Sequence, residues 1–212
     1  MNEPLTLCLA SSNPGKLKEY HRLLGQLPIR LVSAATLGLP APPEEAATFL
    51  ENALAKARAA CTACGLPTLA EDAGLCVPAL DMQPGLRSAR FAPGNDQDRV
   101  HYLLQRMRGM AARQRRAFFY CVVVLMRHGE DPIPCVAQGR WMGRILESPQ
   151  GSEGFGYDPI FCGQGCGPRS AAELTGAEKD RLSHRGRAIR QLRRQLAPAL
   201  AGIMRGPHGQ PG

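Results

Sequence analysis

Residues 5–25 read LTLCLASSNPGKLKEYHRLLG, and the fold can be worked out from this stretch outward. The apolar segment at 5–10 alternates larger and smaller side chains as a β-strand does, and the turn-forming residues of 11–16 end that pattern. Apolar side chains then recur at helical spacing from Leu17 until Gly25. The stretch therefore predicts a strand, a polar glycine-containing loop and a helix in succession.

Local signals of the same kind predict the other elements of the chain. Thr48 to Glu51 match a capping box, in which a hydroxyl and a carboxylate satisfy backbone donors at a helix start, and Thr175 to Glu178 match a second one. The most hydrophobic run, Phe118–Met126, predicts a central strand. The other elements expected are a helix over 48–64, a buried strand over 67–70 that ends at two acids, a loop over 78–95, a helix capped by Asn95 or Asp96 that reaches Met107, a strand around 139–146, and a C-terminal helix interrupted near Gly186.

The composition is that of an ordinary globular protein. Of the 212 residues, 44% are hydrophobic and 21% are charged, and no stretch approaches the ~18 to 20 uninterrupted apolar residues of a membrane helix. This composition excludes a transmembrane or a disordered protein. Residues 1–13 lack the basic region of a signal or transit peptide, so we expect the protein in the cytoplasm. We expect one domain over 1–201 and a flexible tail over 202–212.

The net charge of +8 is a feature of the C-terminus. Residues 175–212 hold eight Lys and Arg against two Asp and Glu, which accounts for +6 of the total. Such a basic segment could contact the phosphates of a polymer, form a solvated face, or line a site for a highly charged small molecule. Composition alone does not choose among these three roles.

Eight cysteines are scattered through apolar and loop segments, which is typical of reduced thiols in a reducing compartment. The pairs Cys61 and Cys64, and Cys162 and Cys166, could together supply four zinc ligands. The first pair lies in an alanine-rich predicted helix, and no histidine stands at ligand spacing. Free thiols are therefore favoured over a zinc site.

Two polar segments carry the groups that a phosphorylated substrate needs. Residues 11–16 offer hydroxyls, an amide, backbone N–H groups and the Lys16 cation at a helix start, although their glycine spacing is not that of a Walker A sequence. The acidic pairs 44–45 and 71–72 could hold Mg²⁺ through oxygens and leave water positions for substrate phosphates. An ordinary polar loop and solvated charge are the alternatives that these residues leave open.

Read together, the polar segments belong to an ordered series of motifs over about residues 5–200. The series comprises Ser11, Asn13 and Lys16, then Thr48 to Ala53, Glu71 to Leu75, Pro84 to Arg90, the sequence GFGYDPIF at 154–161, and finally 171–174, 178–179 and 183–186. In this order the motifs make the chain similar to the inosine/xanthosine triphosphate pyrophosphatase family, whose members remove deaminated purine nucleotides from the precursor pool.

The resemblance implies a fold and a reaction. The fold is an elongated, two-lobed α/β protein with a central mixed β-sheet flanked by helices and a nucleotide cleft between the lobes. In the reaction, water attacks the α-phosphorus of a nucleoside triphosphate and releases the monophosphate and pyrophosphate. We therefore expect a purine nucleoside triphosphate as substrate, Mg²⁺ as cofactor and a homodimer as assembly, with no membrane and no nucleic-acid partner.

The resemblance also implies the site residues. Asp72 matches the acid that activates water, and Phe155 matches an aromatic ring that stacks on the base. The implied metal ligands are Glu44, Glu71 and Asp72. The implied substrate contacts are Ser11, Asn13, Lys16, Ala73, Phe155, Gly156, Tyr157, Asp158, Lys179, Ser183, His184 and Arg185.

Two of these positions depart from the family pattern. Glu71 stands where the family has aspartate, and Ala73 stands where it has serine. A longer carboxylate can still bind a metal, whereas Ala73 lacks a hydroxyl that could bind phosphate or water. The segment Cys162–Gly167 also departs from the usual loop at the pocket rim. Because Asp72 is retained, we expect an active enzyme.

Two other functions compete with the enzyme. A nucleic-acid-binding protein that uses the Arg-rich C-terminal helix would show salt-sensitive polymer binding and no consumption of ITP. A nucleotide sensor without catalysis would bind ITP but not turn it over. The presence of Lys16 and Asp72 argues against the sensor.

Overall fold

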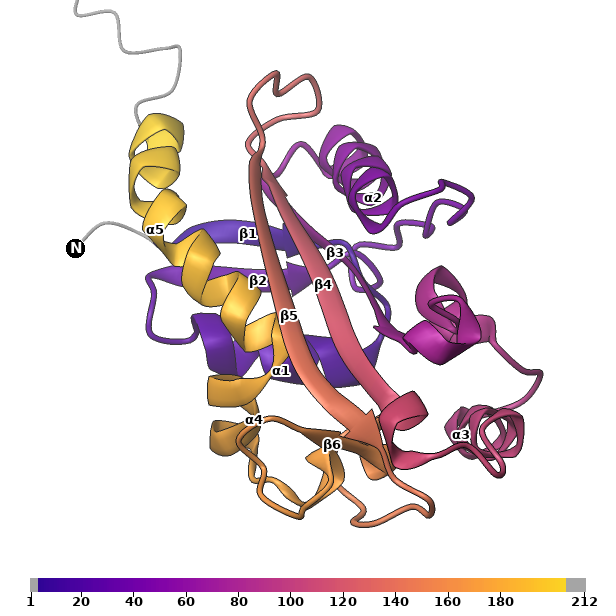
Figure 1. Cartoon of the computed structure of the whole chain (residues 1–212). Helices are drawn as coiled ribbons and strands as arrows, with labels where there is room; N and C mark the ends of the chain where they lie inside the picture. Colours follow the sequence, from indigo (N-terminus) through magenta and orange to yellow (C-terminus); the bar gives the residue numbers. More distant parts are fainter. Residues whose placement is uncertain (1–3, 205–212) are drawn as a thin grey trace, which may run out of the picture. The chain divides into compact units, whose positions relative to one another are not determined.

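A computed structural model describes residues 4–204 of the chain, with side chains up to Leu196. Six strands form one sheet in the order β2-β1-β3-β4-β5-β6 (Figure 1). Strand β1 is parallel to both β2 and β3, whereas β5 and β6 are antiparallel, so the sheet is mixed. The α/β fold with a central mixed sheet, predicted from the sequence, is therefore confirmed. The strands are β1 (Leu5–Leu9), β2 (Ile29–Ser33), β3 (Thr68–Cys76), β4 (Arg116–Met126), β5 (Cys135–Ile145) and β6 (Phe161–Gly163).

The chain divides into two compact units, which are described separately. The first consists of residues 4–72, 122–137 and 188–204 within the described range, and the second of residues 73–121 and 138–187. Strands β3, β4 and β5 each supply residues to both units. The strand predicted over Phe118–Met126 is confirmed as part of β4, whereas β5 begins four residues before its predicted start.

The first unit contains the strand, loop and helix expected over residues 5–25. After β1, the side chain of Asn13 caps α1 (Pro14–Leu24) by accepting a hydrogen bond from the backbone of Lys16. Helix α2 (Phe49–Cys64) begins after Thr48, as predicted. The side chain of Glu51 accepts the Thr48 hydroxyl there, at 2.8 Å. Helix α1 contacts β2, and α2 contacts β1 (Figure 1).

The prediction that the third strand ends before its acidic pair is wrong. Strand β3 continues through Glu71 and Asp72 to Cys76, and both carboxylates are buried. Charged side chains are tolerated in a buried strand when each finds charged or hydrogen-bonding partners, and both acids do so here. The strand therefore presents its two acids to opposite faces, because successive side chains alternate.

The second unit has its own apolar core and two further helices. The Phe161 ring packs edge to face against Phe119 and Trp141, with centroids 4.7 and 5.2 Å away. Residues 78–95, predicted as loop, contain only two short 3₁₀ turns, Pro78–Leu80 and Gly85–Arg90. Three further 3₁₀ turns lie at Ala112–Arg115, Asp158–Ile160 and Ala171–Glu173. Helix α3 spans Asp96–Arg106, and α4 spans Gly176–Leu182.

The C-terminal helical region is interrupted at Ser183 rather than near Gly186, where we predicted the break. Ser183 has an extended backbone, which ends α4, and α5 (His184–Met204) starts at the next residue. The Ser183 hydroxyl accepts the backbone N–H of Gly186 at 3.1 Å, as an N-cap does. The capping side chain, and not the flexible glycine, therefore sets the break.

Three general expectations bear on the whole chain. All eight cysteines carry free thiols. Among residues 4–204, no helix combines the length and the apolar character that a membrane crossing requires. The tail expected over 202–212 overlaps the end of α5 for three residues, and residues 205–212 lie outside the described range.

Candidate functional site

The loop between β1 and α1 holds the first group of predicted substrate residues. The backbone N–H of Asn13 donates to the Ser11 hydroxyl at 3.2 Å, and the Asn13 side chain accepts the backbone N–H of Lys16 at 3.1 Å. These contacts fix the turn that leads into the helix. The positive end of the α1 dipole and the Lys16 ammonium therefore come from one short segment, as an anion site requires.

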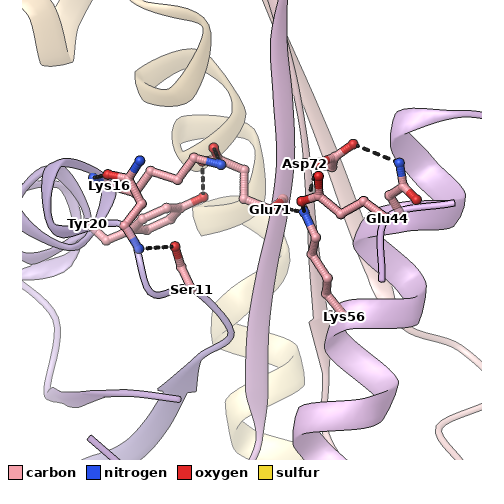
Figure 2. A network of polar contacts seen from close by, with 9 residues as sticks. Ser11, Lys16, Tyr20, Glu44, Lys56, Glu71 and Asp72 are labelled. Carbon is pink, nitrogen blue, oxygen red and sulfur yellow. Dashed lines mark hydrogen bonds and ion pairs between the residues drawn. The ribbon is translucent and has the colours of Figure 1, made fainter. Parts of the chain in front are cut away.

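Glu71 connects this loop to the sheet. Its Oε1 lies 3.0 Å from the Lys16 Nζ, and its Oε2 accepts the Tyr20 hydroxyl at 2.7 Å. Figure 2 shows Glu71 directed to the side of β3 that carries Lys16 and Tyr20, and Asp72 directed to the other side. The two neighbouring acids therefore take part in two different networks.

Asp72 belongs to a network that is built on α2. The Lys56 ammonium donates to the Asp72 Oδ1 at 2.8 Å and pairs with the carboxylate of Glu44 as well (Figure 2). The Asn52 amide donates to the Asp72 Oδ2 at 3.2 Å. Asn52 and Lys56 are one helical turn apart, so both reach the same point. One ammonium thus holds two carboxylates that come from a loop and a strand.

The electrostatics of this network favour a proton acceptor. Burial raises the pKa of Asp72 above its ordinary value of 3.8, although Lys56 opposes the shift. Burial alone would lower the pKa of Lys56, but Asp72 and Glu44 outweigh it and raise the pKa above 10.5. Lys56 therefore remains charged at neutral pH, and Asp72 is a carboxylate whose affinity for a proton is higher than usual.

The predicted metal ligands do not form one cluster. Within residues 4–204, no three Asp, Glu, His or Cys side chains lie close enough together to hold a metal ion by themselves. Glu44 and Asp72 meet at Lys56, while Glu71 faces Lys16 on the other side of β3. The carboxylates of Glu44 and Asp72 thus meet at the position of the Lys56 ammonium. Two such carboxylates suit Mg²⁺, which commonly takes one or two protein carboxylates and completes its shell with water and phosphate.

The second unit gathers the residues predicted to contact the base. The Asp158 Oδ2 accepts the Lys179 ammonium at 2.5 Å and the backbone N–H of Phe155 at 2.9 Å, and Asp158 and Lys179 are both buried. Phe155 is partly exposed. The Lys179 Nζ and the Arg185 guanidinium carbon lie over its ring, 4.9 and 5.6 Å from the ring centroid. An aromatic face is thus presented beside two cations.

Two further residues of the GFGYDPIF motif are fixed by contacts within the same unit. The backbone N–H of Gly156 donates to the Asp96 carboxylate at 2.7 Å. The Tyr157 hydroxyl donates to the backbone carbonyl of Ser88 at 3.0 Å, and burial raises the pKa of that tyrosine. The loop that carries Phe155 is therefore anchored at the two residues that follow Phe155 in the sequence.

Three further predicted contacts are Ser183, which precedes α5, His184 at the start of α5, and Ala73 in β3. Ser183 caps α5, and the His184 ring stacks on Phe119 with a centroid distance of 4.7 Å and an interplanar angle of 13°. Both side chains are buried. Ala73 follows Asp72 in β3 and is partly exposed.

Sequence reasoning missed Tyr20, Asn52 and Lys56 as members of the site. Two signals could have found the last two. Asn52 lies inside the motif at 48–53. Lys56 follows Asn52 by one helical turn, so it lies on the same face of an alanine-rich helix, and a face of such a helix must be buried. Tyr20 gave no such signal, because an aromatic residue at helical spacing reads as an ordinary core residue.

Comparison with known proteins decides the family. A model of the Ham1 family matches residues 7–195, which is most of the chain. The chain belongs to the Ham1 family. It is 50% identical over 192 residues to a dITP/XTP pyrophosphatase of Xanthomonas oryzae pv. oryzae, covering 90% of this chain and 96% of that protein. It is 47% identical over 193 residues to a dITP/XTP pyrophosphatase of Nitrosomonas europaea, covering 90% and 94%.

Solved structures of the Ham1 family have the same fold. A HAM1 protein from Coxiella burnetii superposes with a TM-score of 0.82 at 41% identity, covering 92% of this chain and 99% of that one. The Ham1 protein of Staphylococcus aureus gives 0.78 at 31% identity, with the same coverage. The match over nearly the full length of these proteins includes both compact units.

Proposed function

We propose that the protein hydrolyses deaminated purine nucleoside triphosphates, namely ITP, dITP and XTP, to the monophosphate and pyrophosphate. The similarity to dITP/XTP pyrophosphatases over 90% of the chain supports this substrate class. The observation that carries the chemistry is the buried Asp72 carboxylate, held by Lys56 and Asn52 in the network that also contains Glu44.

We assign the phosphates to the loop between β1 and α1. Backbone N–H groups at the start of α1, together with the Ser11 hydroxyl and the Lys16 ammonium, neutralise and orient the triphosphate chain. Asp72, whose pKa is raised by burial, accepts a proton from the water that attacks the α-phosphorus. Bound Mg²⁺, held by Glu44 and Asp72, would supply further neutralisation of phosphate charge.

We assign the base to the loop that carries Phe155. Phe155 stacks on the purine, and the donors of His184 and Arg185 contact its polar edge. Stacking does not distinguish one purine from another, so these donors must select the base. A 6-oxo purine offers an acceptor to them, whereas adenine places an amino donor at that position and would leave donors facing each other. We expect ITP to be preferred over ATP for this reason.

The cofactor, assembly and location follow as further parts of the proposal. We propose Mg²⁺ as the metal because the two carboxylates at Lys56 are hard oxygen ligands. We propose a homodimer on the family resemblance. We propose the cytoplasm as the location because free thiols are typical of a reducing compartment.

One incubation tests the function against its rivals. The protein is mixed with Mg²⁺ and each of ITP, XTP, ATP, GTP and their deoxy forms, and released pyrophosphate and phosphate are measured separately. The proposal requires pyrophosphate release from ITP, dITP and XTP. Binding of ITP without turnover would indicate a sensor, and salt-sensitive polymer binding with no ITP consumption would indicate a nucleic-acid-binding protein.

Replacing Phe155 by alanine is expected to raise KM for ITP. Loss of a base-stacking face costs ~1–3 kcal/mol in proteins that stack nucleic-acid bases on aromatic rings. Steady-state kinetics of Phe155→Ala should show this in KM, while Phe155→Tyr, which keeps an aromatic face, should remain close to the unmodified enzyme. An unchanged KM in the alanine variant would place Phe155 in the packing of its loop instead.

The basic residues of the C-terminal region should divide into two groups. Neutralising Lys179 or Arg185 is expected to depress ITP turnover, because both cations lie beside the Phe155 ring. Neutralising Arg190, Arg193 and Arg194 together should leave turnover nearly unchanged, since these follow on later turns of α5. The measurement is kcat/KM for ITP in each variant.

The triple variant is the matched control for the two single ones. Because Lys179 pairs with the buried Asp158, thermal unfolding of the Lys179 variant is measured beside its activity. A polymer-binding protein would reverse the pattern, since the triple variant would then weaken nucleic-acid binding most. Loss of ITP turnover in the triple variant alone would refute the assignment of Lys179 and Arg185.

A further inference from the structure

Tyr20, Glu71 and Lys16 form a continuous chain of contacts on one side of β3. The Tyr20 hydroxyl donates to one Glu71 oxygen at 2.7 Å, and the other Glu71 oxygen lies 3.0 Å from the Lys16 ammonium (Figure 2). Tyr20 is completely buried, and Glu71 is 2% exposed. The Lys16 side chain is 18% exposed, so of these three residues Lys16 is the one open to solvent.

The length of the Glu71 side chain decides which groups it meets. A buried carboxylate needs donors for both of its oxygens, and here it has a hydroxyl on one and an ammonium on the other. An aspartate at this position would be one methylene shorter, and its carboxylate would lie closer to the β3 backbone. The length of the glutamate therefore lets one carboxylate meet both the tyrosine and the lysine.

We propose that Tyr20 is a positioning residue for phosphate binding and acts through Glu71 on the Lys16 ammonium. The hydroxyl fixes the rotation of the Glu71 carboxylate, and the carboxylate in turn holds Lys16 extended from the first turn of α1. A preorganised cation loses less side-chain freedom when the triphosphate binds. This inference rests on the proposed function, in which Lys16 binds the phosphates.

The proposal predicts a coupled effect of two substitutions. Tyr20→Phe should weaken the binding of inorganic tripolyphosphate, measured by calorimetry, by about tenfold, because a hydrogen bond to a charged group is lost. It should raise KM for ITP to a similar extent and leave kcat nearly unchanged, since Asp72 is untouched. In a Glu71→Met background, which has no carboxylate to accept the tyrosine hydroxyl, Tyr20→Phe should add no further effect on tripolyphosphate binding.

Controls separate positioning from general packing. Tyr120→Phe removes a tyrosine hydrogen bond to Gln138 elsewhere and should change neither tripolyphosphate binding nor KM. Thermal unfolding of every variant is measured as well. The loss of stability across the variants should not be proportional to the loss of tripolyphosphate binding. An equal effect of Tyr20→Phe in both backgrounds, or unchanged tripolyphosphate binding in a folded Tyr20→Phe variant, would overturn the proposal.

The outcomes also separate this inference from the proposed function. If the unmodified protein releases pyrophosphate from ITP but Tyr20→Phe behaves like Tyr120→Phe, the function stands and the positioning role falls. If the protein turns over none of the nucleotides yet binds tripolyphosphate in a Tyr20-dependent way, the proposed function falls and the positioning role at a phosphate site stands.

Discussion

Asp72→Asn is expected to reduce kcat for ITP by about 10²-fold or more while the protein remains folded. The amide has nearly the same shape as the carboxylate and can still accept a hydrogen bond from Lys56 at its oxygen. It cannot take a proton from water at neutral pH, so general-base catalysis is lost. Steady-state kinetics with pyrophosphate detection measure the effect, and calorimetric binding of a non-hydrolysable ITP analogue shows whether the substrate still binds.

The pH profile supplies an independent check on this assignment. Burial raises the pKa of Asp72, so the rate of the unmodified enzyme should fall on acidification at a higher pH than an ordinary carboxyl group would give. Asp72→Asn should lose this acidic limb together with the rate. Near-normal turnover by the asparagine variant would exclude Asp72 as the base.

The control for Asp72→Asn is Asp81→Asn, which changes an acid outside the networks of Glu71 and Asp72. Asp81 has a left-handed backbone, which asparagine tolerates well, and it lies in the turn after the first 3₁₀ helix. This variant should keep both the rate and its pH profile. A comparable loss of rate in Asp81→Asn would show that such a substitution lowers the rate at an unrelated acid as well. The loss in Asp72→Asn would then not indicate a base at position 72.

The elements that the sequence predicted correctly carry strong local signals. Thr175 and Glu178 form both hydrogen bonds of the capping box, whereas Thr48 caps its helix by accepting the backbone N–H of Glu51. Each of these interactions is completed within four residues. Strand β2 was missed, since Ile29–Ser33 is only five residues long, contains an exposed arginine and depends on pairing with β1. The short strand β6 was missed too, because its three residues depend on pairing with β5.

The site shows the same limit more sharply. The motifs point to Asp72 and Glu71, but only the structure shows that β3 runs on through them and sends them to opposite faces. That separation comes from long-range partners, Tyr20 on one side and Lys56 on the other. Hydrogen bonds between residues that are 16 or more positions apart have no local signature in a single sequence.

Lys56→Met is expected to have the second large effect, on stability and rate together. Lys56 is 8% exposed and pairs with both Asp72 and Glu44. Removing one partner of a buried ion pair typically costs about 3–5 kcal/mol, because the remaining charge is left in a poorly solvated place. Chemical denaturation should show this loss, whereas Lys18→Met, at an exposed lysine of α1, should leave the free energy of unfolding within about 0.5 kcal/mol.

The pH dependence of the Lys56→Met variant distinguishes a role at Asp72 from simple loss of packing. Lys56 opposes the upward shift of the Asp72 pKa, so without it that pKa rises further. At a given pH more of Asp72 is then protonated, and the acidic limb of kcat should move to higher pH, with part of the activity returning as the pH is raised. The stability difference should narrow at alkaline pH, because the raised pKa of Lys56 means that its contribution is complete below 10.5 and is lost above it. A folded variant with an unshifted limb would show that Lys56 supports the fold of α2 and β3 but does not set the protonation of Asp72.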